Sequence, residues 1–270
     1  MTQTARLSLA ILAVLHAAAL FAAWIAPYSP AEQHRDFALT PPSRQFLLGT
    51  DSLGRDQFSR LLYGARISLF SGISAALAAA ALGTLLGLLA GYRGGWIDWI
   101  VMGTSELFIG LPWTYALLGV RAALPLDASP SMVLAGLLGV LAIVGWARPA
   151  RLVRGIALSV RERHYVLAAR GFGAGHSYIL TRHLLPEVRP AVAEFICLAA
   201  PQFVLAEVTL SFLGLGLQEP AASWGTMLAA FCRLDVMTTA PWMAAPVAAL
   251  TVTAACYQGL IASGRTELRR

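Results

Sequence analysis

Long apolar stretches alternate with shorter polar segments along the whole chain. A stretch of about 20 apolar residues lets an α-helix cross the hydrocarbon core of a membrane. Irregular backbone cannot face lipid, because its polar groups would lose their hydrogen bonds. The pattern predicts an all-α, polytopic membrane protein, a single transmembrane domain over residues 1–270 with about six spanning helices. The predicted spans are residues 7–26, 69–92, 96–118, 132–146, 190–213 and 241–261.

The first stretch, residues 7–26, has a competing interpretation, a cleaved signal peptide. The apolar region of a signal peptide is about 7–15 residues long. Because this stretch is longer, an uncleaved first span is favoured. His16 lies within it, and we expect its imidazole to face another helix as a satisfied polar group rather than to bind a ligand.

The polar segment of about residues 27–66 is rich in proline and arginine and too irregular to lie in lipid. It is predicted to be an external loop. Asp51 and Asp56 suit turn and helix-cap positions, because a short carboxylate side chain accepts hydrogen bonds from nearby backbone N–H groups. Gly49 and Gly54 suit tight turns, where glycine takes a positive φ without steric cost.

The polar segment of about residues 148–187 holds seven arginines before Pro186. Cytoplasmic loops carry an excess of positive residues, so this segment and both chain termini are predicted to be cytoplasmic. Ala168 and Ala169 leave a shallow face on a helix, and Pro186 is expected to reset the chain before the next apolar stretch. The result would be a short projection that fits a groove on another protein. The glycines expected to bend it are Gly171, Gly173 and Gly175.

Some residues within the apolar stretches are poorly suited to face lipid. Glu106 and Glu207 should face a partner helix or an aqueous path, because a carboxylate in contact with lipid is costly. Asp98 lies near the end of its stretch and can reach the interface. Small residues at four-residue spacing let two helix backbones approach closely. They are Gly83, Gly87 and Gly91.

Composition supports the membrane prediction and limits the chemistry. The chain is 57% hydrophobic and 13% charged, whereas a soluble domain is about 45–50% apolar and about 25% charged. The net charge of +6 comes from arginine alone, and its clustering fits cytoplasmic loops better than nucleic-acid binding. Arg265, Arg269 and Arg270 would hold the C-terminal tail inside. Since the chain has no lysine, it cannot form a Gly-x4-Gly-Lys-Ser/Thr phosphate loop, so another chain must handle any ATP.

Cysteine spacing gives no sign of a metal or disulfide framework. Cys197, Cys232 and Cys256 are far apart and form no Cys-x-x-Cys pair. Gly171-x-Gly173-x-Gly175 follows no predicted strand and lacks the dinucleotide-binding spacing. We therefore expect no catalytic residue, no metal and no cofactor on this chain.

The segment around Ala168 and Ala169 resembles the cytoplasmic coupling loop of ABC importer permeases. In that family an acidic residue and two alanines are followed at fixed distances by a glycine and by Leu-Pro. Leu167 stands where the acidic residue is usual, and His183 stands in place of an isoleucine. The resemblance implies that this segment contacts an ATPase subunit. The matching residues are Tyr165, Ala168, Ala169, Gly173, Leu185 and Pro186.

Two further segments resemble the oligopeptide, dipeptide and nickel branch of the same importers. The first is Leu48-Gly-Thr-Asp-Ser-Leu-Gly-Arg-Asp56, whose matching residues are Gly49, Asp51, Gly54, Arg55 and Asp56. The second is Ser211-Phe-Leu-Gly-Leu-Gly216, followed by Trp224 and Gly225. Gly214 and Gly216 would bend the chain into a partly embedded external loop, and Trp224 would anchor it at the interface. Glu106 before Pro112 also fits a pattern common in the family.

Taken together, these matches identify the chain as a member of the permease subunits of binding-protein-dependent ABC importers. The resemblance implies a multi-pass protein of the bacterial inner membrane, surrounded by lipid, that is not itself an enzyme. Its implied partners are a second, related permease, two ATPase subunits that carry the ATP and Mg, and an extracytoplasmic solute-binding protein. No nucleic acid is expected. Di- or oligopeptides are the favoured solute, and nickel or a nickel complex is the alternative.

Two other functional classes remain open at this stage. An ion-coupled secondary transporter would use Glu106, Glu194 or Glu207 and need no ATPase, but the two repeated halves with interrupted helices that would favour it are not visible. An intramembrane hydrolase would need a nucleophile beside a base, and His16 with scattered serines offers no credible pair.

Overall fold

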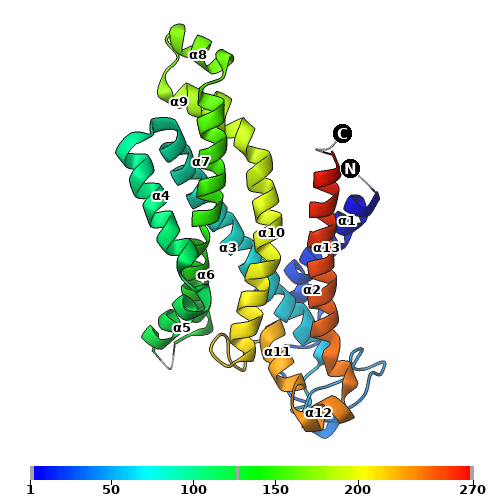
Figure 1. Ribbon diagram of the computed structural model, residues 1–270. Coiled ribbons are helices and arrows are strands. Elements are labelled where there is room, and N and C mark those ends of the chain that lie inside the picture. Colours follow the sequence, from blue (N-terminus) through cyan, green and yellow to red (C-terminus); the bar gives the residue numbers. More distant parts are fainter. Residues whose placement is uncertain (1–2, 126–127, 268–270) are drawn as a thin grey trace. The chain divides into compact units, whose positions relative to one another are not determined.

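The computed structural model describes residues 3–125 and 128–267, and the regular elements within them are helices (Figure 1). A single antiparallel bridge joins Thr50 to Asp56. Short 3-10 turns occur at Arg35–Phe37 and Pro241–Ala244. The α-helices are α1 (Gln3–Leu20), α2 (Ala22–Ile25), α3 (Gln57–Arg93), α4 (Gly95–Gly110), α5 (Trp113–Ala123), α6 (Pro130–Gly145), α7 (Ala147–Arg161), α8 (His164–Gly171), α9 (His176–Ile179), α10 (Leu185–Phe212), α11 (Trp224–Phe231), α12 (Leu234–Thr239) and α13 (Ala245–Glu267).

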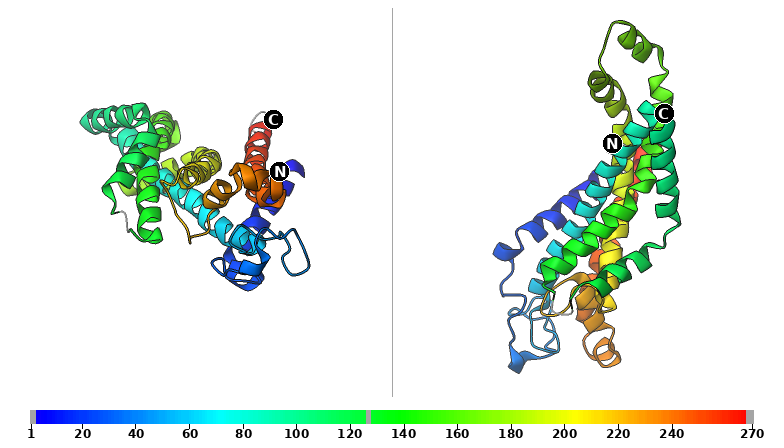
Figure 2. Two further views of the ribbon diagram at one scale, coloured as in Figure 1. Left: turned by 90° about the horizontal axis from the view of Figure 1, so that it is seen from below. Right: turned by 90° about the vertical axis from the view of Figure 1, so that its left-hand side faces the viewer.

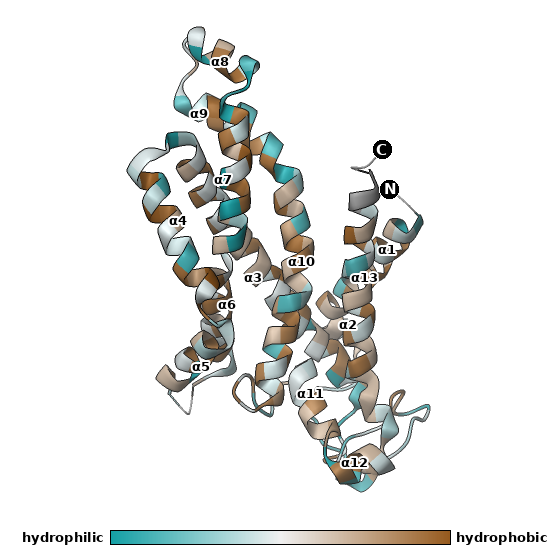
Figure 3. Ribbon diagram, in the orientation of Figure 1, coloured by the Kyte–Doolittle hydropathy of each residue, from teal (hydrophilic) through white to brown (hydrophobic). Residues whose placement is uncertain are grey.

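Five helical segments of the described chain are long and apolar enough to cross a membrane. Apolar residues extend along most of their length (Figure 3). The all-α, polytopic prediction is thereby confirmed. The five segments are Gln3–Leu20, Gln57–Arg93, Pro130–Arg161, His176–Phe212 and Pro241–Ser263.

The remaining predicted span, residues 96–118, is divided into α4 and α5. The helix stops because Leu111, the residue before Pro112, takes an extended conformation with ψ 121°. A residue that precedes proline is disfavoured in the helical region. The apolar run therefore forms two shorter helices rather than one continuous span.

α3 begins at Gln57, inside the segment of about residues 27–66 that was predicted to be an external loop. Asp56 precedes its first residue, and the Asp56 carboxylate accepts the Ser59 backbone N–H at 2.8 Å, as predicted for a helix cap. Residues 57–66 are therefore helical and continuous with the second apolar stretch.

Pro186 does not reset the chain, so that expectation is wrong. The helix is continuous from α9 through a π-helical turn, Leu180–Leu184, into α10. Proline has no N–H, and its ring clashes with the carbonyl four residues earlier. In the π turn the Leu185 N–H bonds to the Leu180 carbonyl, five residues back, which widens the helix just before Pro186.

The chain divides into two compact units, and α3, α5, α6 and α10 contribute to both. The first unit is drawn from Met1–Ile73, Arg121–Leu137 and Ala200–Arg270. The second is drawn from Ser74–Val120 and Leu138–Ala199. Arg269 and Arg270, expected to hold the tail inside, lie outside the described residues.

In the first unit α1 lies along α13 (Figure 1). The approach is close, because a Cβ on Gly259 would come within 2.5 Å of the Ser8 hydroxyl. His16 Nδ1 donates a hydrogen bond to the Leu12 carbonyl of its own helix, and the ring meets the edge of Phe70 on α3. A buried apolar cluster then joins α1, α3, α10 and α11. Its members are Ala19, Ala65, Leu69, Val204, Val208, Trp224 and Met227.

In the second unit the glycines of α3 pack against α7, which confirms the predicted close approach of two helices. A Cβ on Gly83 or Gly87 would come within 2.6 Å of a backbone carbonyl, that of Trp146 or Ala150 respectively. A Cβ on Gly91 would lie 2.7 Å from that of Ala157. Small residues in lipid allow van der Waals contact directly between backbones.

Candidate functional site

α8 and α9 lie beyond the end of α7 and form the predicted projection (Figures 1 and 2). We call residues 162–187 the α8–α9 segment. It is not a loose loop, because three of its apolar side chains are buried in a shared core with the ends of α3 and α7. That core consists of Val166, Ile179 and Leu184 from the segment and Tyr92, Ala157 and Val160 from the two helices.

α8 ends in a hydrogen-bonded glycine cap. Gly173 has φ 85°, the Gly173 N–H donates to the Arg170 carbonyl at 2.9 Å, and the Ala174 N–H donates to the Ala169 carbonyl at 3.0 Å. These bonds define a Schellman motif, which satisfies the last carbonyls of a helix and reverses the chain. The bend expected at Gly173 is confirmed. It is not shared by Gly171, the last helical residue, or by Gly175, whose φ is −70°.

The outer surface of α8 carries exposed apolar side chains beside the exposed Arg170. Ala168 is exposed and Ala169 is half-buried, so the two alanines leave a shallow face. Leu167, in the place of the family's acidic residue, is exposed, and the adjoining Phe172 is 93% exposed. Such a surface suits packing into a groove on a partner.

The base of the segment is tied back to the start of α10. The Tyr165 hydroxyl donates to the Glu187 carboxylate at 3.1 Å, and both groups are exposed. Leu185 is half-buried and Pro186 is exposed in the first turn of α10. Tyr165 therefore adds a hydrogen bond between α8 and the first turn of α10.

A second candidate site lies in the first unit, where the expected residue Asp51 is buried among charges. The Asp51 carboxylate accepts the Arg55 Nε–H at 2.7 Å. The two terminal nitrogens of the Arg55 guanidinium, Nη1 and Nη2, contact the Glu219 carboxylate. Arg60 donates to Glu219 at 2.8 Å, and to the Pro30 carbonyl at 3.1 Å. We call Asp51, Arg55, Arg60 and Glu219 the four-charge cluster.

The turn before α3 places Asp51 and Arg55 within this cluster. Asp51 Oδ1 accepts the backbone N–H groups of Leu53 and Arg55, each at 2.9 Å. Gly49 and Gly54 have φ 68° and 75°, as the turn prediction required. A Cβ on Gly54 would overlap the His34 carbonyl oxygen at 2.0 Å. Glycine is thus needed at both positions.

Burial alone would lower the pKa of the Arg55 guanidinium. The hydrogen bonds and negative charges of Glu219 and Asp51 outweigh that effect, so the Arg55 pKa is raised above its ordinary value. Arg55 consequently remains charged throughout the physiological pH range, and the cluster balances two positive against two negative charges.

Arg60 and Glu219 were not predicted as site residues from the sequence. Glu219 lies 159 residues from Arg60 along the chain, so no local pattern relates them. A signal was present in Arg60 itself, because an arginine at the start of a helix that becomes a membrane span requires a buried partner or an aqueous surface.

Glu207 is 1% exposed and lies in a group of hydroxyls in the first unit. It accepts hydrogen bonds from Ser68 at 2.7 Å and from Ser211 at 2.8 Å. The Ser68 oxygen also accepts the Trp224 backbone N–H at 3.2 Å. Glu207 therefore links α3, α10 and the start of α11.

Trp224 is 1% exposed, so the expectation that it anchors a loop at the membrane interface is wrong. Its indole N–H donates to the Leu61 carbonyl at 3.1 Å, which satisfies the polar edge of the ring inside the protein. The neighbouring Gly225 packs against α10, where a Cβ would meet the Val208 carbonyl at 2.5 Å.

The chain bends after α10 as predicted, through a second Schellman motif. Gly214 has φ 73°, and the Leu215 N–H donates to the Leu210 carbonyl at 2.9 Å. Gly216 does not share the positive φ; glycine is needed there because a Cβ would come within 2.6 Å of the Ser211 hydroxyl.

Glu106 in the second unit has a different environment from Glu207. Its side chain is 65% exposed and forms an ion pair with Arg151 at 3.0 Å. Asp98, in the first turn of α4, accepts the Arg154 Nε–H at 2.9 Å. Pro112 is exposed where α4 and α5 separate. The two carboxylates thus connect α4 to α7.

None of these groups forms a metal centre. The described residues contain no group of three or more His, Cys, Asp or Glu side chains able to hold an ion. Cys197, Cys232 and Cys256 are free thiols. The polar side chains described above take part in helix packing and in ion pairs.

Comparison with known proteins gives two matching family models. The model described as a binding-protein-dependent transport system inner membrane component matches residues 83–263. The model described as the N-terminal transmembrane domain of oligopeptide transport permease C matches residues 3–42. Together the two matched ranges include the first and the last of the predicted membrane spans.

Individual relatives are similar over most of this chain. A dipeptide transport system permease protein of Bacillus subtilis is 40% identical over 217 residues, which are 80% of this chain and 66% of that protein. An oligopeptide transport system permease protein of the same organism is 34% identical over 88% of this chain and 75% of its own length. A glutathione transport system permease protein of Shigella dysenteriae is 39% identical over 95% of this chain and 82% of its own length.

Proposed function

The chain belongs to the family of binding-protein-dependent transport system inner membrane components, and we propose that it forms half of the solute path of an ATP-driven importer. A second, related permease supplies the other half. Two ATPase subunits hold the ATP and Mg, and an extracytoplasmic solute-binding protein delivers the cargo. This chain makes and breaks no covalent bond.

The α8–α9 segment is the observation that carries this proposal. Its exposed apolar face docks in a groove on one ATPase, with Ala169 packed into the groove and Gly173 presenting the helix. Because Val166, Ile179 and Leu184 share a core with α3 and α7, movement of α8 passes to those helices as a rigid body. Closure of the ATPase pair then opens the path outward, an alternating-access change.

Di- or oligopeptides are the solute that we propose. The relatives are named as dipeptide, oligopeptide and glutathione permeases, and glutathione is itself a small peptide. Nickel or a nickel complex, the other solute class of the resembled branch, has no such support among them. Membership of the family also favours an importer over an ion-coupled transporter or an intramembrane hydrolase.

We place the α8–α9 segment, the end of α7 and both termini on the cytoplasmic side, with residues 27–56 and 215–239 outside. Arginine clustering in and around α7–α9 supports this orientation. The four-charge cluster then stabilises the external side of the permease, where the solute-binding protein docks.

The coupling role is tested with Ala169→Trp and Gly173→Val. A tryptophan at 169 should clash on the ATPase, and valine at 173 should be strained because L-residues other than glycine disfavour φ 85°. We expect normal membrane insertion but weakened ATPase association, or hydrolysis that the loaded binding protein no longer stimulates. Gly171→Ala, at a helical position with open space around it, is the control. Full association and stimulated turnover in both variants would refute the coupling role.

The solute is tested by reconstituting the complete complex with its binding protein in liposomes. Labelled dipeptide should be transported only when ATP is supplied on the side of the ATPase subunits and the binding protein is present on the other side. Transport of labelled nickel without any transport of the dipeptide would replace the peptide assignment and leave the coupling role intact.

A further inference from the structure

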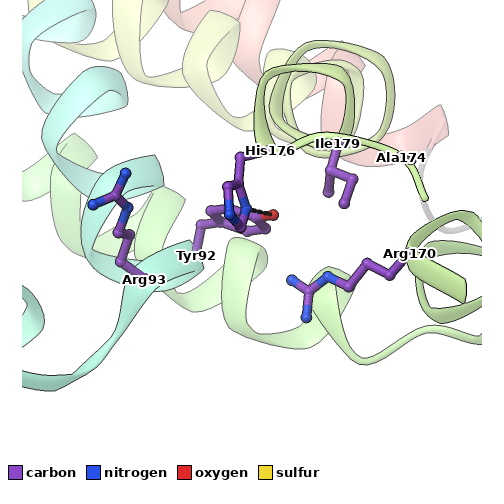
Figure 4. Close-up of a pocket in the computed structure, with 6 residues that line it drawn as sticks. All are labelled: Tyr92, Arg93, Arg170, Ala174, His176 and Ile179. Atoms are coloured by element: carbon purple, nitrogen blue, oxygen red, sulfur yellow. Dashed lines mark hydrogen bonds between the residues drawn. The ribbon is translucent and has the colours of Figure 1, made fainter.

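A cavity of about 540 Å³ lies between the end of α3 and the α8–α9 segment (Figure 4). All of its lining belongs to the second unit. Two arginines and a histidine contribute to the lining, and none of the described residues that line it is acidic. The lining residues are Tyr92, Arg93, Arg170, Ala174, His176 and Ile179.

Both arginines of the cavity have unused hydrogen-bonding capacity. Within the described part of the chain neither Arg93 nor Arg170 forms an ion pair with a carboxylate. The Arg170 guanidinium carbon lies 5.1 Å from the centre of the Tyr92 ring. Stacking on an aromatic face holds a guanidinium in place and leaves its edge N–H donors free.

A histidine adds a third polar group held in a defined position. His176 Nδ1 is hydrogen-bonded to the Tyr92 hydroxyl at 2.8 Å, and the two rings meet edge to face. When the Tyr92 hydroxyl donates this bond, the proton of the neutral His176 ring is on Nε2, where it can be donated to an oxygen acceptor. In the view of Figure 4, Arg93 and Arg170 lie on opposite sides of this Tyr92–His176 pair.

The cavity also lies at the level where lipid headgroups are expected. Arg93 is the last residue of the spanning helix α3. The first two turns of α4 then expose Trp96 by 72% and Trp99 by 78%. Exposed tryptophans are enriched at the membrane–water interface, next to the lipid phosphates.

We propose that this cavity binds a phosphate group, drawn from the headgroup of an anionic membrane lipid. Arg93 and Arg170 supply charge-assisted hydrogen bonds to the phosphate oxygens, and His176 supplies a further donor. The bound phosphate bridges the end of α3 and the end of α8, and so holds the α8–α9 segment in place. The assignment does not depend on which solute is transported.

The test uses the full-length chain in its purified complex. The complex is placed in nanodiscs of phosphatidylcholine with or without phosphatidylglycerol, and the lipid retained after detergent extraction is measured by mass spectrometry. We expect retention of phosphatidylglycerol over phosphatidylcholine, lowered roughly tenfold by Arg93→Gln or Arg170→Gln, because each removes charge-assisted hydrogen bonds. Arg182→Gln is the matched control, since Arg182 is an exposed arginine of the same segment that does not line the cavity.

A second arm titrates the detergent-purified complex with inorganic phosphate, using chloride as the reference anion. Binding of phosphate that requires Arg93 and Arg170, without enrichment of phosphatidylglycerol, supports the site and makes its source a soluble phosphate compound. The proposal is overturned if the unsubstituted complex binds neither probe, a result that needs no variant to fold. It is also overturned if Arg182→Gln is as damaging as the two cavity substitutions.

Discussion

Arg60 shows how a single residue secures a large part of the first unit. Its side chain is 1% exposed and contacts Glu219, the Pro30 carbonyl and, at 3.9 Å, Asp51. A buried charge is tolerated only when opposite charges and hydrogen bonds replace the water that it loses. Arg60 thereby joins the start of α3 to the polar segment before it and to Glu219, 159 residues further along the chain.

Replacing Arg60 by methionine should lower the free energy of unfolding by about 1–3 kcal/mol, because it removes a buried hydrogen-bond donor from the Pro30 carbonyl and from Glu219, whose side chain is 43% exposed. Thermal unfolding of the purified chain in detergent measures the change. Arg44→Met is the control, as Arg44 is exposed. Equal unfolding midpoints for the two variants would mean that the four-charge cluster is not a stabilising element.

Glu207 and Glu106 should respond differently to replacement by glutamine. Glu207→Gln keeps one acceptor but presents an amide to a serine that formerly donated, so we expect a loss of about 1–3 kcal/mol and a lower yield of assembled complex. Glu106 is mostly exposed, and its pair with Arg151 contributes at most about 1 kcal/mol. Glu106→Gln should therefore assemble normally and show its effect in transport.

Uptake assays and complex yield, measured side by side on both variants, separate these two roles. Wild-type yield and wild-type uptake in Glu207→Gln would contradict the packing role of that carboxylate. A yield defect confined to Glu106→Gln would reverse the assignment of the two residues.

At the scale of elements, two prolines have opposite effects on their helices. Pro112 separates α4 from α5, because the residue before it becomes extended. Pro186 lies inside a continuous helix. In the π turn at Leu180–Leu184, just before this proline, the Leu185 N–H bonds to the carbonyl five residues back instead of four. The effect of a proline on its helix thus depends on whether the preceding turn can widen, and π turns occur often at functional sites.

The packing of α3 on α7 is also an element-scale property, and Gly87 tests it. A Cβ at Gly87 would lie 2.5 Å from the Ala150 carbonyl oxygen, which is too close for contact without a backbone shift. Gly87→Ala should therefore destabilise the chain by about 1–3 kcal/mol. Gly103→Ala on α4 is the control, because a Cβ there meets nothing within 4 Å; denaturant titration that found both substitutions neutral would exclude tight α3–α7 packing.

At the scale of the whole molecule, the orientation in the membrane is the property most open to direct measurement. Single cysteines are introduced at Ser177 on α9 and at Ser43 in the first polar segment, in a Cys232→Ser background because Cys232 is exposed. An impermeant thiol reagent added to intact cells should label position 43 and not position 177. Both serines are exposed, so burial does not explain a difference. Labelling of position 177 and not of position 43 would mean that the chain has the opposite orientation in the membrane.

Features that depend on local chemistry could be predicted from the amino-acid sequence. Apolar stretches of membrane length specify helices, and glycine at Gly49, Gly54, Gly173 and Gly214 reports positive φ, because other residues disfavour that conformation. Asp56 is identifiable as a cap for the same reason, since its hydrogen bond closes within three residues. Each of these inferences needs only the nearest neighbours along the chain.

Contacts between residues far apart in the sequence could not be predicted and are visible only in the folded chain. The pairing of Arg60 with Glu219, the burial of Trp224 beneath the Leu61 carbonyl, and the cavity between the ends of α3 and α8 join residues far apart in sequence. Periodicity records which face of a helix is apolar, but not which helix will cover it. The same indole can therefore lie at a membrane interface or inside the protein, and its environment is set by whether a carbonyl within the fold accepts its N–H.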